Sequence, residues 1–457
     1  LQVCTGRPII MNSTGDLGFF IKKCNKGEIE MNVQMIMALC ILVFMVVMLL
    51  THVLPYGVTG MICCVLFVFT GVLDLKTAFS GLSSSTTLMI APMIVVATAL
   101  GKTSLIHRLR GVMGKLQGKS GAMLVLGLCG MTILLSQLMG QVACISVMLL
   151  FIQTFDYDSE YSPSRLLFLV ATVNCLATSK FPIGMGATMP GTITSYYQGL
   201  VGPEDYLGIA DFCKAGILPL IVGVIYCLIF YKLIPNGSID KSQVKDVKDA
   251  APISRKDEYF IFGVFAAIML GFMFTKQLGS DITNVIPAAG LLVLIVFKVL
   301  EIPEVMKTLT CDMVWMVAGM SVVSTALSKT GVGELIGQTV LNILGGHPSG
   351  LFVSIVFCVA CALMTNFMSN MGTMALMSPI AASTALAGGM NVKAVVLCCC
   401  VSAWLAFVMP TGCSGTMMAF GIGNQNPLKT LRFTLPLLVL TMIALIIGIN
   451  IFFPIYG

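Results

Sequence analysis

The sequence predicts an all-α polytopic membrane protein made of two inverted repeats, each with five transmembrane helices, a re-entrant hairpin and a broken helix. Three observations predict this fold class: the composition, a repeat between the halves, and the distribution of Lys and Arg. Of the 457 residues, 57% are hydrophobic and only 10% are charged, which excludes a soluble globular or a disordered chain. Many apolar runs are long enough to cross a bilayer, for which a helix needs about 20 residues.

Short loops with Gly and Pro separate the apolar runs. The expected spans are 33–53, 57–73, 86–101, a hairpin near 121–153, 165–198, 214–234, 259–277, 285–300, 312–328, a hairpin near 350–386, 393–423 and 433–454. The expected units are a polar N-terminal tail (1–30), a first repeat (31–234), a cytoplasmic linker (235–258) and a second repeat (259–457). The tail lacks the apolar core of a signal peptide. Its basic residues conflict with an outside location, which favours a native start at Met31 over a tail that tolerates the charge bias.

The two halves share sequence. The segment 93–103 matches 320–330 at eight of eleven positions, including Thr-Ala-Leu-x-Lys-Thr in order. Continued at nearly the same offset, the alignment places Gly140-Gln141-Val142 on Ser369-Asn370-Met371. Two apolar helices would not readily share such a pattern by chance, so the chain is predicted to contain two copies of an internal repeat.

Lys and Arg gather in alternate loops. One set of loops holds Lys102, Arg108, Arg110, Lys115, Lys119, Arg165, Lys232, the linker cluster, Lys298, Lys307, Lys429 and Arg432. The other set holds only Lys76, Lys214, Lys276, Lys329 and Lys393. The richer set is therefore predicted to be cytoplasmic. Because each half has an odd number of spans, the second repeat is inverted, as in many secondary transporters.

A polar, Gly-bearing stretch from Thr365 to Pro379 interrupts the apolar run 351–387. Irregular backbone at membrane depth is tolerated only where protein or a water-filled cavity covers it. The stretch is therefore predicted to be a re-entrant hairpin whose tip carries Ser369, Asn370 and Thr373. Such a tip offers oxygen ligands and a helix N-terminus that favours an anion.

Two further apolar spans are interrupted by Gly, Pro and hydroxyl residues, at Pro182–Ser195 and at Pro410–Thr416. A single Gly/Pro kink in a transmembrane helix is usually structural. Two breaks at corresponding positions of two repeats, each following a hairpin, instead indicate a binding site.

Other function classes fit poorly. His52, His107 and His347 are far apart, and no protease, hydrolase or phosphate-loop motif occurs, so an enzyme is not expected. No Cys/His metal spacing occurs, so we expect no transition metal and no cofactor other than sodium as a coupling ion. The net charge of +6 follows membrane sidedness and does not indicate a nucleic-acid partner. An ion channel is less expected than a carrier, because hairpins meeting broken helices build an occluded site.

With Ser369-Asn370-Met371-Gly372-Thr373 and then Ala406-Phe407-Val408-Met409-Pro410, the chain resembles divalent anion–sodium symporters, the di-/tricarboxylate and sulfate carriers. The resemblance covers almost all of the chain from Met31. It implies a homodimer in the cell (inner or plasma) membrane, in contact with lipid, with a fixed scaffold and a transport domain that moves as an elevator. Sodium would bind at each hairpin tip, and a small anionic substrate would bind between the tips.

The resemblance also implies individual site residues. The second-half ion site would consist of Thr365, Met368 through its carbonyl, Ser369, Asn370 and Gly412. The first-half ion site would consist of Ser136, Gln141 and Gly191. The substrate would contact Gln141, Thr192, Asn370, Thr373 and Cys413.

Departures from the family pattern gather in the first half. Gly140 stands where the family has Ser, and Gln141 is longer than the family's Asn. Val142 and Met371 replace Thr at both tips. The prediction is a secondary active carrier of small organic anions, di- or monocarboxylates, coupled to sodium with a degraded first ion site. The alternatives are an inorganic, sulfate-like anion carrier, a sodium-independent exchanger, or an ion channel.

Lys180 is the only Lys or Arg placed well inside a predicted span. Ionisable residues within a membrane are candidates for function. One interpretation is a side chain that snorkels to the cytoplasmic interface or caps carbonyls near Pro182. The other is a fixed cation near the first ion site, which replaces sodium or holds an anion.

Overall fold

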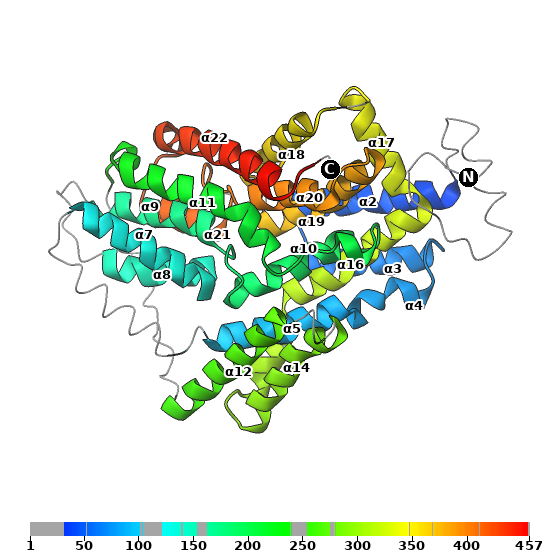
Figure 1. Ribbon diagram of the computed structural model, residues 1–457, viewed down its shortest axis with the longest axis horizontal. Helices are drawn as coiled ribbons and strands as arrows, with labels where there is room; N and C mark the ends of the chain where they lie inside the picture. The colour runs from blue at the N-terminus through cyan, green and yellow to red at the C-terminus, as the bar shows by residue number, and fades with distance from the viewer. Residues whose placement is uncertain are drawn as a thin grey trace.

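Every regular element of the described part of the chain is a helix (Figure 1). The computed structural model describes residues 32–51, 53–100, 103, 121–138, 140–152, 162–237, 239, 254–274, 278, 280–346, 348–367, 369–410 and 412–455. The predicted tail 1–30 and most of the predicted linker 235–258 lie outside this range. The all-α fold class is confirmed, while the boundaries of the four sequence units remain predictions.

The helices of the first half, with bounds, are α2 (Val33–Thr51), α3 (Tyr56–Phe69), α4 (Leu75–Ala78), η1 (Ser80–Ser83), α5 (Ser85–Leu100), α7 (Gly121–Leu138), α8 (Gln141–Ile152), α9 (Pro163–Ala177), η2 (Gly184–Thr188), α10 (Met189–Tyr197), η3 (Pro203–Asp205), α11 (Asp211–Phe230) and η4 (Tyr231–Leu233). Those of the second half are α12 (Arg255–Met273), α14 (Ser280–Val296), α15 (Ile302–Leu309), α16 (Asp312–Thr330), α17 (Val332–Ile343), α18 (Gly350–Thr365), α19 (Asn370–Ala387), α20 (Val392–Ser402), α21 (Ser414–Ile422) and α22 (Pro427–Phe452).

Among the described residues, three helical stretches are long and apolar enough to cross a membrane: Asp211–Leu233, Ile302–Thr330 and Pro427–Phe452. Shorter apolar helices also occur, and several of them belong to the predicted hairpins and broken spans. The hairpins consist of α7 with α8 and of α18 with α19. The broken spans consist of α9 with α10 and of α20 with α21. All four units are interrupted as predicted, but the two breaks begin earlier in the chain than the sequence indicates. Helix α9 ends at Ala177 and α20 at Ser402, whereas α10 resumes at Met189, inside the predicted break Pro182–Ser195.

The two halves make matching contacts. In the first half α7 and α8 both pack on α9, and in the second α18 and α19 both pack on α20. In addition, α5 packs on α14, as α16 packs on α3. The hairpin helix of each half contacts the broken helix of the other half, since α8 packs on α21 and α19 on α10. The halves are therefore interleaved around these four helices; α10 and α19 lie near the middle of Figure 1, and α8 and α21 lie to the left of them.

Helix α17 follows α16 and was not among the predicted spans. It packs on α19 and buries Val332, Gly333, Gly337 and Leu341, while Glu334 lies outside that buried face. The spacing of its buried residues is that of an amphipathic helix. Such a helix lacks the continuous apolar run by which a span is predicted.

Candidate ion and substrate site

The tip of the second hairpin is the turn between Thr365, which ends α18, and Asn370, which begins α19. Ser369 is the N-cap of α19, and its hydroxyl accepts a hydrogen bond from the Gly372 N–H at 3.0 Å. This cap satisfies one of the free N–H groups at the helix start. The predicted ligand Ser369 thus uses its side chain to shape the tip. Met368 lies outside the described residues.

Behind this tip, four polar groups from three segments converge. The side-chain amide of Asn370 lies 2.9 Å from Thr365 Oγ1 and 3.2 Å from the carbonyl oxygens of both Ala403 and Gly412 when its nitrogen faces them. Thr365 Oγ1 also donates to the Ala403 carbonyl. Thr365 and Asn370 are both buried. We call this set, Thr365, Asn370, Ala403 and Gly412, the oxygen cluster.

The amide of Asn370 can serve the oxygen cluster in two orientations. With nitrogen inward, it donates hydrogen bonds to the three oxygens. With oxygen inward, it accepts from Thr365 Oγ1 and places four oxygens around one point. Hydroxyl, amide and carbonyl oxygens are ligands of hard cations, so the second orientation suits a cation such as sodium.

In each half, a buried side-chain amide forms hydrogen bonds between the hairpin and a broken span. The sequence had given neither amide a role. Asn366 Nδ2 donates to the carbonyls of its own helix and of Leu405 (3.2 Å), and its Oδ1 accepts from the Val408 and Met409 N–H groups. In the first half, Gln137 Nε2 donates to the Ala177 carbonyl at 2.7 Å, and its Oε1 accepts from the Phe181 N–H at 3.2 Å. Both amides are 4% exposed. The sequence carried one signal for these two amides: in each repeat a polar residue directly follows the aligned positions Ser136 and Thr365.

These matching bonds align the two breaks. Phe181 corresponds to Met409, so Gly184 occupies the position of Gly412 and Thr188 that of Thr416. The structure does not join the predicted Gly191 and Thr192 to the first tip by any described bond. A side chain at Gly191 would meet Met89 of α5 at 2.4 Å. The Thr192 hydroxyl donates to the Thr188 carbonyl within its own helical segment. The sequence allows Pro182 to be aligned with Pro410, but it allows other alignments of the two breaks as well. The hydrogen bonds of Gln137 and Asn366 select this one.

The first tip, between α7 and α8, is built differently. The Ser136 hydroxyl donates to the Ile133 carbonyl in its own helix and accepts from the amide of Gln137. Gln141 Nε2 contacts Cys175 Sγ at 3.9 Å. Gly140 has no atom within 4 Å of the place where a Cβ would stand. The described bonds of Ser136 and Gln141 therefore do not bring these two side chains to a common point, unlike Thr365 and Asn370.

Two predicted substrate residues are buried beside these tips. Cys413 is the N-cap of α21, and its Sγ lies 3.1 Å from Cys175 Sγ of α9. Its Sγ also accepts from the Thr416 N–H at 3.4 Å. The Thr373 hydroxyl on α19 is buried and has no hydrogen-bond partner. Cys413 is thus occupied with shaping the break, whereas Thr373 keeps its hydroxyl available to a ligand.

Lys180 does not snorkel out of the protein. Its side chain is 3% exposed, and its Nζ is buried without a hydrogen-bond partner. The ammonium lies 4.7 Å from the centroid of the Phe212 ring and 5.5 Å from that of Trp404. Burying a charge at the bilayer centre costs at least ~2.5–3.5 kcal/mol, and a desolvated cation–π contact returns about 2 kcal/mol. The rings offset the charge but accept none of the three N–H donors well.

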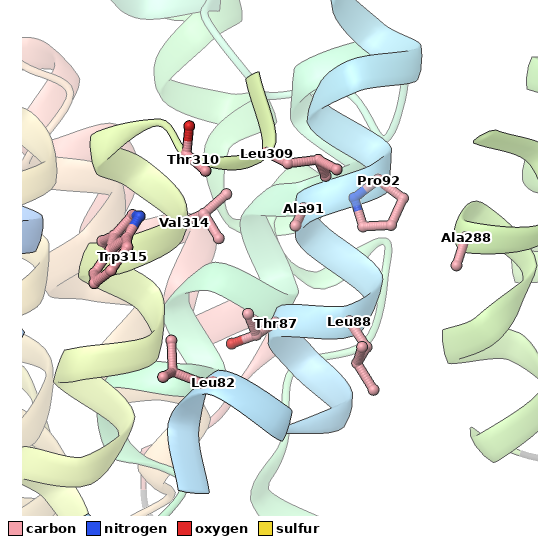
Figure 2. A pocket seen from close by; sticks show the side chains of 10 residues that line it. All are labelled: Leu82, Thr87, Leu88, Ala91, Pro92, Ala288, Leu309, Thr310, Val314 and Trp315. Atoms are coloured by element: carbon pink, nitrogen blue, oxygen red, sulfur yellow. The ribbon is translucent and has the colours of Figure 1, made fainter. Parts of the chain in front are cut away.

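A cavity of 330 Å³ lies elsewhere in the fold, between α5, α14 and the α15–α16 turn (Figure 2). Its lining is almost entirely apolar, and none of the predicted site residues contributes to it. The two hydroxyls that it contains, those of Thr87 and Thr310, already donate to backbone carbonyls. This cavity is chemically unsuited to an anion.

Comparison with known proteins places the chain among transporters. A transporter of Haemophilus influenzae without assigned function is 21% identical over 89% of this chain and 90% of its own length. A transporter of Synechocystis, also without assigned function, is 28% identical to this chain over 34% of its length, and the match spans only 25% of that relative. Solute carrier family 13 member 2 of Rattus norvegicus is 26% identical over 32% of this chain and 25% of its own length.

Among solved structures, the YdaH transporter of Alcanivorax borkumensis has the same fold. Its TM-score is 0.58 at 14% sequence identity, with 92% of this chain and 98% of that chain covered. Together with the apolar helices, these relatives confirm the predicted multi-pass membrane protein, and the relatives themselves are transporters, not enzymes. The family model described as citrate transporter matches residues 42–399 and 269–456, so the chain belongs to the citrate transporter family.

Proposed function

We propose that this protein is a secondary active carrier of small carboxylates, and that a sodium ion at the oxygen cluster drives uptake. The observation that supports the proposal is the difference between the hairpins. The second hairpin gathers Thr365, Asn370 and two backbone carbonyls around one point, whereas the described bonds of Ser136 and Gln141 lead to separate partners. One coupling ion per protomer follows, where two intact tips would supply two.

The substrate class is supported by charge and helix direction. Asn370, the first residue of α19, lies 3.2 Å from the carbonyl of Gly412, which stands just before α21. Two helix N-termini therefore meet at the oxygen cluster, and each carries a partial positive charge. Sodium would add a full charge beside them. A carboxylate is the anion that the family description, citrate transporter, suggests.

Sodium and substrate would act in order. With the amide oxygen of Asn370 turned toward the ion, the tip loses the amide's hydrogen bonds to the Ala403 and Gly412 carbonyls and gains a cation. The anion then binds against the ion, the α19 and α21 N-termini and the free Thr373 hydroxyl. In the elevator arrangement implied by the symporter resemblance, the hairpins and broken spans move together against a homodimeric scaffold.

The scaffold is expected to pair with its copy through spans 57–101 and 285–328. Single-Cys variants at Gly140 and Ser369, in a chain whose other Cys are replaced, should not cross-link between protomers. A Cys at an exposed scaffold position such as Leu292 should cross-link if it lies near the two-fold axis. Efficient tip-to-tip cross-linking would contradict a moving transport domain.

The proposal is tested by uptake into proteoliposomes. Labelled citrate, succinate, acetate and sulfate are offered with and without an inward sodium gradient. We expect accumulation of a carboxylate that falls at least tenfold when sodium is replaced by choline. Transport that ignores sodium would favour the exchanger alternative, and uptake of sulfate alone would favour the inorganic-anion alternative.

A further inference from the structure

Two buried hydrogen-bond donors without partners lie side by side in the described part of the membrane domain. They are the ammonium of Lys180 and the indole N–H of Trp404. The Lys180 Nζ is 5.5 Å from the centroid of the Trp404 ring, so both donors belong to one small region. The two side chains are 3% and 5% exposed.

The local backbone creates this pairing. After α9 ends, Ser179 adopts a left-handed conformation with φ +56°, which is rare for a residue other than glycine. The turn sends the Lys180 side chain back against α11, where its methylenes occupy the space left by Gly216. Trp404 comes from the other half, just after α20 ends at Ser402. A strained residue and a missing side chain both serve to hold the ammonium in this place.

Neither the Lys180 ammonium nor the Trp404 indole N–H has a hydrogen-bond acceptor among the described residues. The rings of Phe212 and Trp404 attract the cation but leave its N–H groups unpaired. A carboxylate carries two acceptor oxygens and one negative charge, so it would pair with the ammonium and the indole N–H at once. Buried polar groups in native proteins are nearly always paired, and a ligand is one way to complete the pairing.

We propose that Lys180 and Trp404 form a second carboxylate-binding subsite for the transported solute, adjacent to the oxygen cluster. The inference rests on the proposed function, because it assigns one acidic group of the same substrate. Trp404 directly follows Ala403, whose carbonyl belongs to the oxygen cluster. Lys180 directly precedes Phe181, which is fastened to Gln137 of the first hairpin. We expect a solute with two or three carboxylates to engage both places and a monocarboxylate to engage only one.

The chain carries two Trp, Trp315 and Trp404, which allows a test that does not depend on transport. Trp315 lines the apolar cavity of Figure 2 and is not part of the site. In Trp315→Phe, Trp404 alone emits. The purified variant is titrated with citrate, succinate, acetate and sulfate at fixed sodium. We expect a saturable change in Trp404 emission with citrate and succinate, and a response to acetate at least tenfold weaker.

Adding Lys180→Met keeps the length of the side chain and removes its charge. The citrate titration should then shift to at least tenfold higher concentration, with unchanged size-exclusion behaviour as a check of folding. Trp404→Phe keeps an aromatic face for the ammonium but removes the indole N–H, so it should raise the KM for citrate uptake several-fold and leave sodium binding intact. Lys180→Met titrations that match the parent, or Trp404 emission that ignores a carboxylate which the protein transports, would overturn the subsite while the proposed function stands. Emission that responds to sulfate alone would retain an anion site but reject carboxylate as its ligand. If no anion of the panel is transported or changes the emission, both proposals fail.

Discussion

Asn370→Ala is expected to reduce sodium-dependent uptake at least tenfold and to remove its dependence on sodium. The side chain is the shared partner of Thr365, Ala403 and Gly412. Its loss leaves buried carbonyls without a donor and the ion without a ligand. Each buried group left unpaired costs about 1–3 kcal/mol, and about 1.4 kcal/mol is a tenfold change in affinity. Initial uptake rates measured over a range of sodium concentrations give both quantities.

Ser136→Ala is the matched control in the first half. Its hydroxyl donates within its own helix and accepts from the neighbouring Gln137, so its loss removes two hydrogen bonds, each worth about 1 kcal/mol, and no ion ligand. Uptake should change less than threefold, with the same sodium dependence. Equal losses in both variants, with cooperative dependence on sodium in the parent, would show that the two hairpins are equivalent.

Asn366→Leu is expected to destabilise the protein strongly. The substitution keeps the branching and the number of heavy atoms of the side chain but leaves the Leu405 carbonyl and the N–H groups of Val408 and Met409 without the amide. Three such groups amount to about 3 kcal/mol or more. A loss of this size lowers the melting temperature by roughly 5–10 °C in a mid-sized domain. Thermal unfolding of the purified protein, followed by size-exclusion chromatography, measures it.

Asn450→Leu provides the comparison for this variant. Asn450 is an exposed amide near the end of α22, bonded only to the carbonyl one turn earlier. Its replacement should leave the melting temperature within about 2 °C, because surface substitutions rarely exceed ±0.5 kcal/mol. A similar loss in both variants would mean that Asn366 is not a special anchor between hairpin and broken span.

The sequence predicted the architecture because irregular backbone in a membrane needs special residues. Gly, Pro and hydroxyl residues in an apolar run marked the second hairpin and both broken spans, the repeat alignment marked the first hairpin, and the structure has all four. The sequence also identified Thr365 and Asn370, whose side chains provide half of the oxygen cluster. The carbonyl of Ala403 could not be predicted, because any residue presents the same oxygen and only the fold decides where it lies.

The sequence alone also did not determine which residues of the two breaks correspond to each other. The polar run 182–195 offers several Gly and Thr residues, and the resemblance placed Gly191 and Thr192 at the site. The hydrogen bonds of Gln137 and Asn366 instead align Gly184 with Gly412. Likewise, the charge of Lys180 was visible in the sequence, but its ring partners were not. Phe212 and Trp404 are distant in the chain and come together only through tertiary packing.

Equilibrium binding of ²²Na⁺ to the purified protein tests the central claim, that the second hairpin alone keeps a coupling-ion site. We predict about one bound ion per protomer, competed by excess sodium, and unchanged in Ser136→Ala. Thr365→Val keeps the shape of the side chain but removes its hydroxyl, so specific binding should disappear. Two ions per protomer, or binding that survives Thr365→Val, would contradict the account.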